Sequence, residues 1–258
     1  MPIGDNNAPG MLLKSPREID IMARGGLILR GALLAMRDAV RPGISTMELD
    51  QIAESFIRSH AGAEPAFKGL YGFPGSVCIS INEEIVHGIP SRKRILAEGD
   101  IVTVDVGVKL DGMYTDAALT VPVGTIDEET TRLLDVTERA LAAGIAAAVP
   151  DNHVGDIGAA VQGVVEAAGF SVVRELVGHG VGFAPHEELQ IPNYGKPKRG
   201  KKLVPGLTIA IEPMVNVGTP KTRTLSDKWT VVTADGKRSA HFEHTIAITD
   251  SGPRILTL

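Results

Sequence analysis

The stretch DIVTVDVGVKLDGMYTDAALTV, residues 100–121, is dominated by β-branched and small apolar residues and predicts two strands joined by a turn. Asp105 and Asp116 lie inside these apolar runs, where the core of a sheet is expected. A buried carboxylate costs free energy unless a partner neutralises its charge. Some interaction must therefore offset the cost of placing these two aspartates in the sheet.

The turn KLDG, residues 109–112, joins the two predicted strands. With Leu110 and Asp111 as a two-residue loop, the two aspartates lie directly opposite each other. With Asp111 and Gly112 as the loop, they become diagonal neighbours. Either loop places both carboxylates on one face of the hairpin, where their repulsion raises one pKa or recruits a cation.

The predicted elements occur twice in the same order. The segment LAEGDIVTVDVGV, residues 96–108, resembles LVPGLTIAIEPMV, residues 203–215, and aligns Asp105 with Glu212. Likewise RPGISTMELDQIA resembles VPDNHVGDIGAAV, with Pro42 matching Pro150. This repeat predicts two related helix–helix–sheet halves that face each other across a pseudo-twofold axis, with an acidic residue of each half at the midline.

Helices and strands follow from capping signals and apolar patterns. Four helices are predicted, starting at Ser15 and Ser45, each with a capping box, and spanning about 128–147 and 154–168. Strands are predicted at 77–81, 101–108, 113–121, 171–175, 207–217, 229–233 and 241–248. Residues 1–11 are rich in Gly, Asn and Pro and predict a loose tail.

Further ligand-type residues occur in strand-like segments. The candidate set is four carboxylates and one imidazole: Asp105, Asp116, His179, Glu212 and Glu243. Four negative charges balance two divalent cations, so a two-metal site would be tolerable in a partly buried cleft. Each acid alone is more often an edge residue or a hydrogen-bond acceptor, but the five together favour a metal site. Oxygen-rich ligation suits Fe(II), Mn(II) or Co(II), and Zn(II) also fits.

Bulk composition restricts the class of protein. The chain has 258 residues, 43% of them hydrophobic, which is enough for one large domain. Its longest apolar run is too short to cross a bilayer, and the N-terminus lacks the features of a signal peptide. One cysteine excludes an internal disulfide, and the net charge of −5 argues against a general nucleic-acid binder. We therefore expect a cytoplasmic protein with no membrane and no disulfide partner.

Several long motifs resemble type I methionine aminopeptidases of the M24 metallopeptidases. They are SVCISINEEIVHGIP (76–90), the hairpin with its two aspartates, GHGVGFAPHE (178–187), AIEPMV (210–215) and WTVVTADGKRSAHFEHT (229–245). The resemblance implies an α+β "pita-bread" fold, a curved and mostly antiparallel sheet flanked by two pairs of α-helices with internal pseudo-twofold symmetry. It implies one catalytic domain over residues 12–258, with halves at about 12–122 and 123–252.

The resemblance also assigns the metal ligands. Asp105 matches an aspartate that binds one metal, whereas Asp116 and Glu243 match carboxylates that bridge both metals. His179 and Glu212 match ligands of the other metal, and Glu212 also matches the group that transfers a proton from the attacking water to the leaving amine. Two divalent ions are thus the implied cofactors.

Two more histidines match residues that contact the scissile part of the substrate. These are His87 and His186, which would orient the peptide and stabilise the tetrahedral intermediate. The implied reaction is hydrolytic removal of the N-terminal methionine from nascent proteins and peptides, with a preference for a small second residue. Family members are usually monomeric.

The methionine pocket resembles the family less closely. Cys78 and Trp229 match expected pocket residues, whereas Phe73 and Leu70 stand where tyrosine is usual. Three further positions also differ from the usual residues: Phe67, Pro185 and His241, the last in place of a glutamine. The pocket residues remain apolar, so an unbranched thioether should still fit. For each one, ordinary core packing is an equally good interpretation.

The segment GKPKRGKK, residues 195–202, concentrates five cationic side chains. A solvated loop is the simpler interpretation, and a contact with ribosomal RNA is the alternative. Two other functions compete with the methionine enzyme. One is cleavage before proline, although prolidases usually carry a large extra N-terminal domain, and the other is an inactive binding protein, although such relatives typically lose ligands.

Overall fold

The computed structural model describes residues 11–258, which form four α-helices and fifteen strands. The helices are α1 (Pro16–Ala39), α2 (Thr46–Arg58), α3 (Glu128–Ala147) and α4 (Val154–Ala167), with one 3-10 turn, η1 (Leu70–Gly72). Ser15 and Ser45 cap α1 and α2 through the predicted capping boxes with Glu18 and Glu48. All four predicted helices are confirmed.

The strands of the first half are β1 (Ala63–Pro65), β2 (Cys78–Ile81), β3 (Glu84–Val86), β4 (Ile101–Leu110) and β5 (Met113–Pro122). Those of the second half are β6 (Ser171–Val172), β7 (Gly178–Gly180), β8 (Glu187–Ile191), β9 (Thr208–Ile211), β10 (Met214–Asn216), β11 (Thr222–Thr224), β12 (Val231–Thr233), β13 (Ser239–His241), β14 (His244–Thr249) and β15 (Gly252–Ile255). Every strand pair is antiparallel, as expected for this fold.

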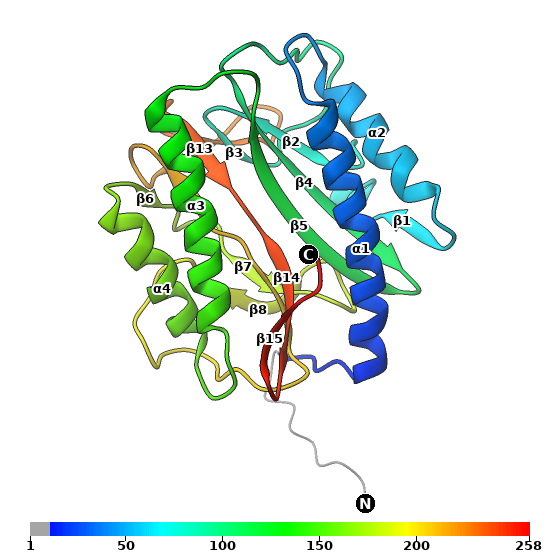
Figure 1. The fold of residues 1–258 in the computed structure, drawn as a ribbon, viewed down its shortest axis with the longest axis vertical. Helices are drawn as coiled ribbons and strands as arrows, with labels where there is room; N and C mark the ends of the chain where they lie inside the picture. Colours follow the sequence, from blue (N-terminus) through cyan, green and yellow to red (C-terminus); the bar gives the residue numbers. More distant parts are fainter. Residues whose placement is uncertain (1–10) are drawn as a thin grey trace, which may run out of the picture.

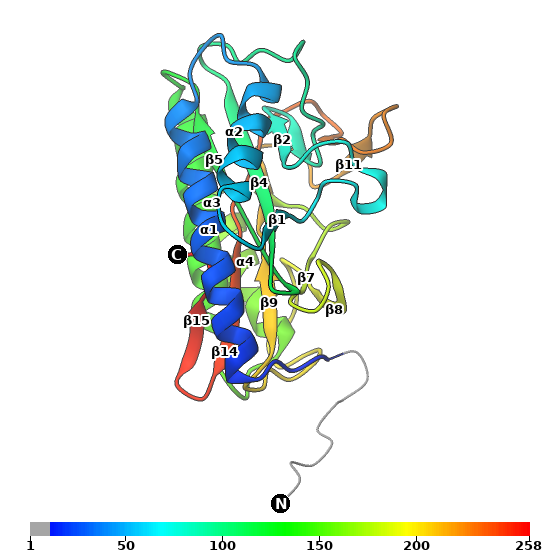
Figure 2. The same ribbon diagram turned by 90° about the vertical axis from the view of Figure 1, so that its right-hand side faces the viewer.

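Figure 1 shows the arrangement of the layers. Helices α1 and α2 lie on one side of the view and α3 and α4 on the other, with the long strands β4, β5 and β14 between them. Turned by 90°, α1 lies on one face of the molecule, whereas β7, β8 and β11 lie toward the opposite face (Figure 2). The helices thus cover one face of the strands and leave the loops of the other face free to form a site.

Two predicted strands are interrupted at the acidic residues that they carry. The predicted strand 207–217 is broken into β9 and β10 by Glu212 and Pro213, because proline has no N–H for the ladder. The predicted strand 241–248 is similarly broken between β13 and β14 at Phe242 and Glu243. The prediction of continuous strands was wrong at both places, and both interruptions carry a candidate ligand.

The β4–β5 hairpin adopts the second of the two predicted registers. Leu110 pairs with Met113, so Asp111 and Gly112 form the loop, both with the positive φ angles (48° and 81°) of a tight hairpin turn. Asp116 pairs with Gly107, which makes it a diagonal neighbour of Asp105 on the same face of the hairpin.

The internal repeat is reproduced in the backbone hydrogen bonds. Gly43 N donates to Leu96 O (2.8 Å), and at the corresponding place in the second half Asp151 N donates to Leu203 O (3.1 Å). Leu96 N in turn donates to Ile44 O, and Leu203 N to Asn152 O. The two halves therefore fold by the same local contacts although their sequences have diverged.

The two halves meet at a central junction, formed by β5 against β13 and β14. The side chain of Thr245 accepts a hydrogen bond from Asp116 N (2.9 Å) and donates one to Asp116 O (2.7 Å). In the same way, the side chain of Thr120 accepts a hydrogen bond from His241 N (3.0 Å) and donates one to His241 O (2.8 Å). Glu243 N donates to Ala118 O (2.9 Å). These contacts fix Asp116 and Glu243, from opposite halves, beside each other.

Met11 is buried among apolar residues of the second half, including Leu207, so the prediction of a loose tail over residues 1–11 was wrong at its last residue. The remainder of the expected tail, residues 1–10, lies outside the described residues. Within residues 11–258, no helix is both long enough and apolar enough to span a membrane.

Replacing Thr245 by valine should destabilise the central junction. The variant Thr245→Val keeps the side-chain shape but leaves the buried N–H and C=O of Asp116 without their partner, at a cost of about 1–3 kcal/mol. Urea unfolding should show this loss, whereas Thr125→Val, at an exposed threonine, should stay within about 0.5 kcal/mol of the parent. Equal stability of both variants would contradict the role given to Thr245.

Candidate metal centre

A cavity of about 280 Å³ opens at the central junction, on the face opposite to the helices. Residues of both halves line it, and they divide into an acidic floor and an apolar wall. The floor consists of Asp105, Asp116, His179, Glu212 and Glu243, and His87 and His186 complete the polar side. All seven polar residues predicted from the sequence are thus brought together in one cavity.

Three buried carboxylates form the first ligand group. Asp105, Asp116 and Glu243 each offer an oxygen within 4.8 Å of the others. Strand pairing positions the first two, whereas Glu243 comes from the break between β13 and β14. Each of the three also has one buried carboxylate oxygen without a hydrogen-bond partner in the described part of the chain. Orphaned buried oxygens of this kind fit a cation.

A second group combines one imidazole with two carboxylates. His179, Glu212 and Glu243 offer ligand atoms within 4.8 Å of one another, and His179 Nε2 lies 3.6 Å from Glu212 Oε1. His179 Nδ1 lies 2.9 Å from the carbonyl of Gly180, which can only accept, so Nδ1 carries the proton. Nε2 is therefore left with a free lone pair that faces the carboxylates, as in a metal-binding histidine.

The charges of this cluster conflict in the absence of a cation. Burial raises the pKa of Asp105 to about 7, and burial with the nearby carboxylates raises the pKa of Asp116, Glu212 and Glu243 well above the usual range. Burial lowers the pKa of His179 to about 4, so its imidazole is neutral at neutral pH. The two ligand groups share Glu243, and a donor set of four carboxylates and a neutral imidazole fits one or two divalent ions.

His186 lies beside this cluster on the loop between β7 and β8. Its ring packs edge-on against His179, with the ring centroids 4.5 Å apart, and stacks at 6.2 Å against Tyr71 from the first half. A ring nitrogen of His186 also lies within 4.8 Å of ligand atoms of Asp116 and His179. The exposed imidazole can therefore reach a group bound over the floor of the cavity.

His87 follows β3 and faces the cavity from the first half. Its φ angle of +61° is uncommon for a residue other than glycine and indicates backbone strain at this position. Partial burial lowers the pKa of His87, so that it is neutral at neutral pH. A strained and neutral imidazole suits hydrogen bonding to a bound substrate.

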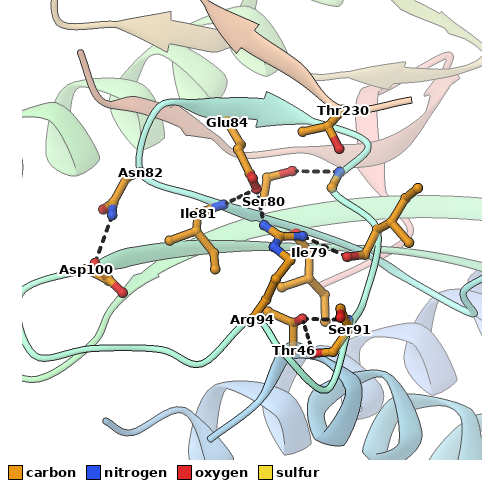
Figure 3. A network of polar contacts seen from close by, with 12 residues as sticks. Thr46, Ile79, Ser80, Ile81, Asn82, Glu84, Ser91, Arg94, Asp100 and Thr230 are labelled. Carbon is orange, nitrogen blue, oxygen red and sulfur yellow. Dashed lines mark hydrogen bonds and ion pairs between the residues drawn. The ribbon is translucent and has the colours of Figure 1, made fainter. Parts of the chain in front are cut away.

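A network centred on Arg94 holds the loop that carries His87 (Figure 3). Arg94 Nη1 donates to the carbonyls of Ile79 (3.1 Å) and Ile89 (2.7 Å), and Nη2 pairs with Glu84. The Gly88 N–H donates to Ser80 Oγ (3.2 Å). The residues on both sides of His87 are thereby tied to β2, which explains how the strained conformation is retained.

The apolar wall contains the four predicted pocket residues. Phe73 and Trp229 pack edge-to-face with ring centroids 5.1 Å apart, and Cys78 and Leu70 lie in the same apolar cluster. The Asp227 carboxylate fixes the backbone at Trp229 by accepting hydrogen bonds from Trp229 N and Thr230 N, both 2.9 Å. An apolar wall next to a polar floor provides a pocket for one apolar side chain.

The three further positions that differ from the family's usual residues lie in different places. Phe67 lines the cavity, whereas the structure places Pro185 outside its lining. His241 is buried, and its Nε2 lies 3.7 Å from Glu212 and 3.9 Å from Glu243. Neither of its ring nitrogens has a hydrogen-bond partner among the described residues, and burial lowers its pKa to about 3. His241 thus lies behind the second ligand group.

Five residues of the lining were not predicted from the sequence: Tyr71, Val86, Leu176, Val177 and Met214. Tyr71 stands out because it is exposed and adopts a φ angle of +51° between two glycines with positive φ. The signal available in the sequence was the short spacing Gly69–Gly72 around an aromatic residue. The other four are ordinary apolar residues with no local signal.

Comparisons with known proteins agree with this site. The family described as "Metallopeptidase family M24" matches residues 20–250. The chain belongs to metallopeptidase family M24. Two bacterial methionine aminopeptidases of this kind, from Clostridium perfringens and Bacillus subtilis, are each 53% identical to it over 96% of this chain and 99% of theirs. The expected resemblance is therefore confirmed.

Solved structures extend the comparison of this M24 chain to its fold. A methionine aminopeptidase from Thermotoga maritima superposes with a TM-score of 0.94 at 43% identity, covering 96% of this chain and 99% of that one. A prolidase from Pyrococcus furiosus superposes with a TM-score of 0.77 at 22% identity, covering 66% of its own length. The pita-bread fold is thus confirmed, and the prolidase likeness concerns the fold alone.

The raised pKa of Asp105 predicts how the metal-free protein responds to pH. A carboxyl group with a raised folded-state pKa favours the folded state below its ordinary pKa and loses this contribution as the pH rises toward 7. We therefore compare the melting temperatures of Asp105→Asn and of the parent, both treated with a chelator. The melting temperature of Asp105→Asn minus that of the parent should increase as the pH is raised from 5 to 8. The exposed control Asp250→Asn should run parallel to the parent, and a parallel curve for Asp105→Asn would contradict the prediction.

Proposed function

We propose that this M24 metallopeptidase removes the N-terminal methionine from peptides and nascent proteins, with two divalent ions bound. The observation that carries the proposal is the pair of ligand groups that share Glu243 on the floor of a cavity with an apolar wall. Fe(II), Mn(II), Co(II) and Zn(II) all fit such a donor set. The names of the relatives support methionine as the residue removed.

The ions would be held by Asp105, Asp116, His179, Glu212 and Glu243. When bound there, divalent ions supply Lewis acidity and lower the pKa of a water molecule. Side chains of the cavity would carry out the remaining steps, which are proton transfer and stabilisation of the developing charge. Glu212 lines the cavity at the break after β9, where its carboxylate can accept a proton from the attacking water and deliver it to the leaving amine.

His87 and His186 act on the scissile peptide from opposite halves. Both imidazoles line the cavity and are only partly removed from solvent, which is enough to lower the pKa of each, so both are mainly neutral and carry one ring N–H at neutral pH. These N–H groups can donate to the oxygen that becomes negative in the tetrahedral intermediate, or orient the peptide nitrogen. Neutral donors suit this role because they add no charge to the free site.

The methionine side chain would lie against the apolar wall. Phe73, Trp229, Cys78 and Leu70 offer aromatic edges and apolar surface, which suit an unbranched and polarisable thioether. Leu70 and Phe73 in place of tyrosines remove hydroxyl groups from this wall, so recognition rests on shape and apolar contact. The preference for a small second residue is expected from the family resemblance alone.

Cleavage before proline is the main competing reaction, since prolidases share the fold. Purified protein should release methionine from Met-Ala-Ser and leave an Xaa-Pro dipeptide intact. Chelation should abolish the activity, and adding back each divalent ion in turn should restore it to different levels. Asp116→Asn serves as the matched inactive control, and preferential Xaa-Pro hydrolysis would overturn the proposal.

We also propose that the enzyme works in the cytoplasm as a monomer and that the basic loop, residues 195–202, contacts ribosomal RNA. All residues of this loop are exposed, and Lys202 pairs with Asp151 at its base. The concentration of positive charge on an acidic protein supports a polyanionic partner.

Neutralising this loop should separate ribosome binding from catalysis. A variant with glutamine at Lys198, Arg199, Lys201 and Lys202 should co-sediment less with ribosomes at low salt, yet cleave Met-Ala-Ser at the parent rate. A control with glutamine at four exposed arginines of α1 and α2 (Arg17, Arg30, Arg37 and Arg58) should bind ribosomes like the parent. Unchanged co-sedimentation of the loop variant would remove this proposal.

A further inference from the structure

Lys14 is a fully buried lysine that immediately precedes the cap of α1. Its Nζ donates to both carboxylate oxygens of Glu187 (2.7 and 2.5 Å) and to the carbonyl of Leu12 (2.9 Å). The side chains of this pair are 0% and 4% exposed. Lysine is rarely buried to this extent, and a buried ion pair by itself is weak support for stability. Its position therefore calls for another explanation.

Glu187 is the residue after His186, at the start of β8. Gly180 pairs with Glu187 across a β-bulge, so residues 181–186 form a closed loop between β7 and β8. Glu187 Oε1 also accepts a hydrogen bond from Phe183 N (2.9 Å), and the Lys14 ammonium lies 5.0 Å from the centroid of the Phe183 ring. One carboxylate thus holds both the start and the end of this loop.

The Lys14 side chain also fits against the backbone of the loop. Gly182 has a φ angle of +144°, and a Cβ atom there would lie 2.3 Å from Lys14 Cε. The carbonyl of Gly182 accepts a hydrogen bond from Tyr114 N (2.8 Å) of β5, the strand that carries Asp116. The loop therefore lies between the N-terminal segment and the strand of a candidate ligand.

We propose that the Lys14–Glu187 pair positions His186, so that Lys14 is a positioning residue for the catalytic step although it lies outside the cavity lining. The inference rests on the proposed function of His186. The pair fixes the backbone on both sides of the imidazole, while His179 and Tyr71 contact only its ring. Without the ammonium group, Glu187 becomes an unpaired buried charge and turns toward solvent, which releases Phe183 and the loop.

Hydrogen exchange tests the positioning without any reference to activity. In Lys14→Met, the amide of Phe183 should exchange faster by about tenfold, the factor that one net hydrogen bond is worth. The matched control is Arg254→Met, which breaks the exposed pair with Asp20 and should leave exchange in residues 181–187 unchanged. Lys14→Arg should largely rescue protection, and parent-like exchange in Lys14→Met would overturn the proposal.

A double-mutant cycle then tests whether Lys14 acts through His186. Lys14→Met should lower kcat for Met-Ala-Ser by about ten- to a hundredfold, since small misplacement of a catalytic group has effects of this size. KM and bound metal should remain near the parent values. In a His186→Ala background, the same substitution should change kcat by less than about twofold.

The pattern of outcomes separates the two proposals. An equal loss of kcat in both backgrounds would mean that Lys14 acts on the whole fold and would overturn the positioning role. If Lys14→Met folds poorly, Lys14→Met with Glu187→Leu leaves no unpaired charge and also removes the acceptor for Phe183; slow, parent-like exchange of the Phe183 amide in that variant would overturn the proposal. If the parent released no methionine, the proposed function would fail while the exchange result still decided the positioning.

Discussion

The constraint on which the structure depends is the burial of four carboxylates at one point between two halves of the chain. Each acid alone would favour leaving the interior, and together they repel one another. Backbone contacts nevertheless hold them there: Thr245 binds the backbone of Asp116 on both sides, and Glu243 pairs through its backbone with Ala118. Backbone contacts of the fold thus offset part of the repulsion between these carboxylates, and a divalent cation held by them would offset the rest.

The repeat explains how a symmetric scaffold yields an asymmetric site. Asp105 and Glu212 occupy corresponding places, but β4 continues past Asp105, whereas β9 ends at Ile211, so that Glu212 and Pro213 lie in the break before β10. Asp105 is therefore flanked by paired strands on both sides, opposite Cys78 and Ala118, and Glu212 lies just beyond a strand end. That difference suits the proposed roles: Asp105 would serve only as a metal ligand, whereas Glu212 would also transfer a proton.

Local chemistry made much of this predictable from the sequence. The capping boxes at Ser15 and Ser45 and the turn at Asp111 and Gly112 depend on neighbouring residues only, and each formed as expected. The sequence left two hairpin registers open, because either places the aspartates on one face. It failed at Phe242 and Glu243, where the strand breaks because Glu243 pairs across the junction with a distant strand. Nothing within a window of ten residues carries that information.

Tyr71 and Lys14 show the same limit for the site. Tyr71 reaches the cavity because a strained turn directs it toward His186 of the other half, and Lys14 is buried because Glu187 lies nearby in space, although it is far away in sequence. Both belong to the loops around the metal centre, not to its strands. The proposed ligands lie on paired strands or at strand ends, whereas His87 and His186 lie on loops held by ion pairs, Arg94 with Glu84 and Lys14 with Glu187. Substitutions in the loops can therefore change how a substrate is held without disturbing the five proposed ligands, so the candidate metal centre can be kept while the pocket around it differs.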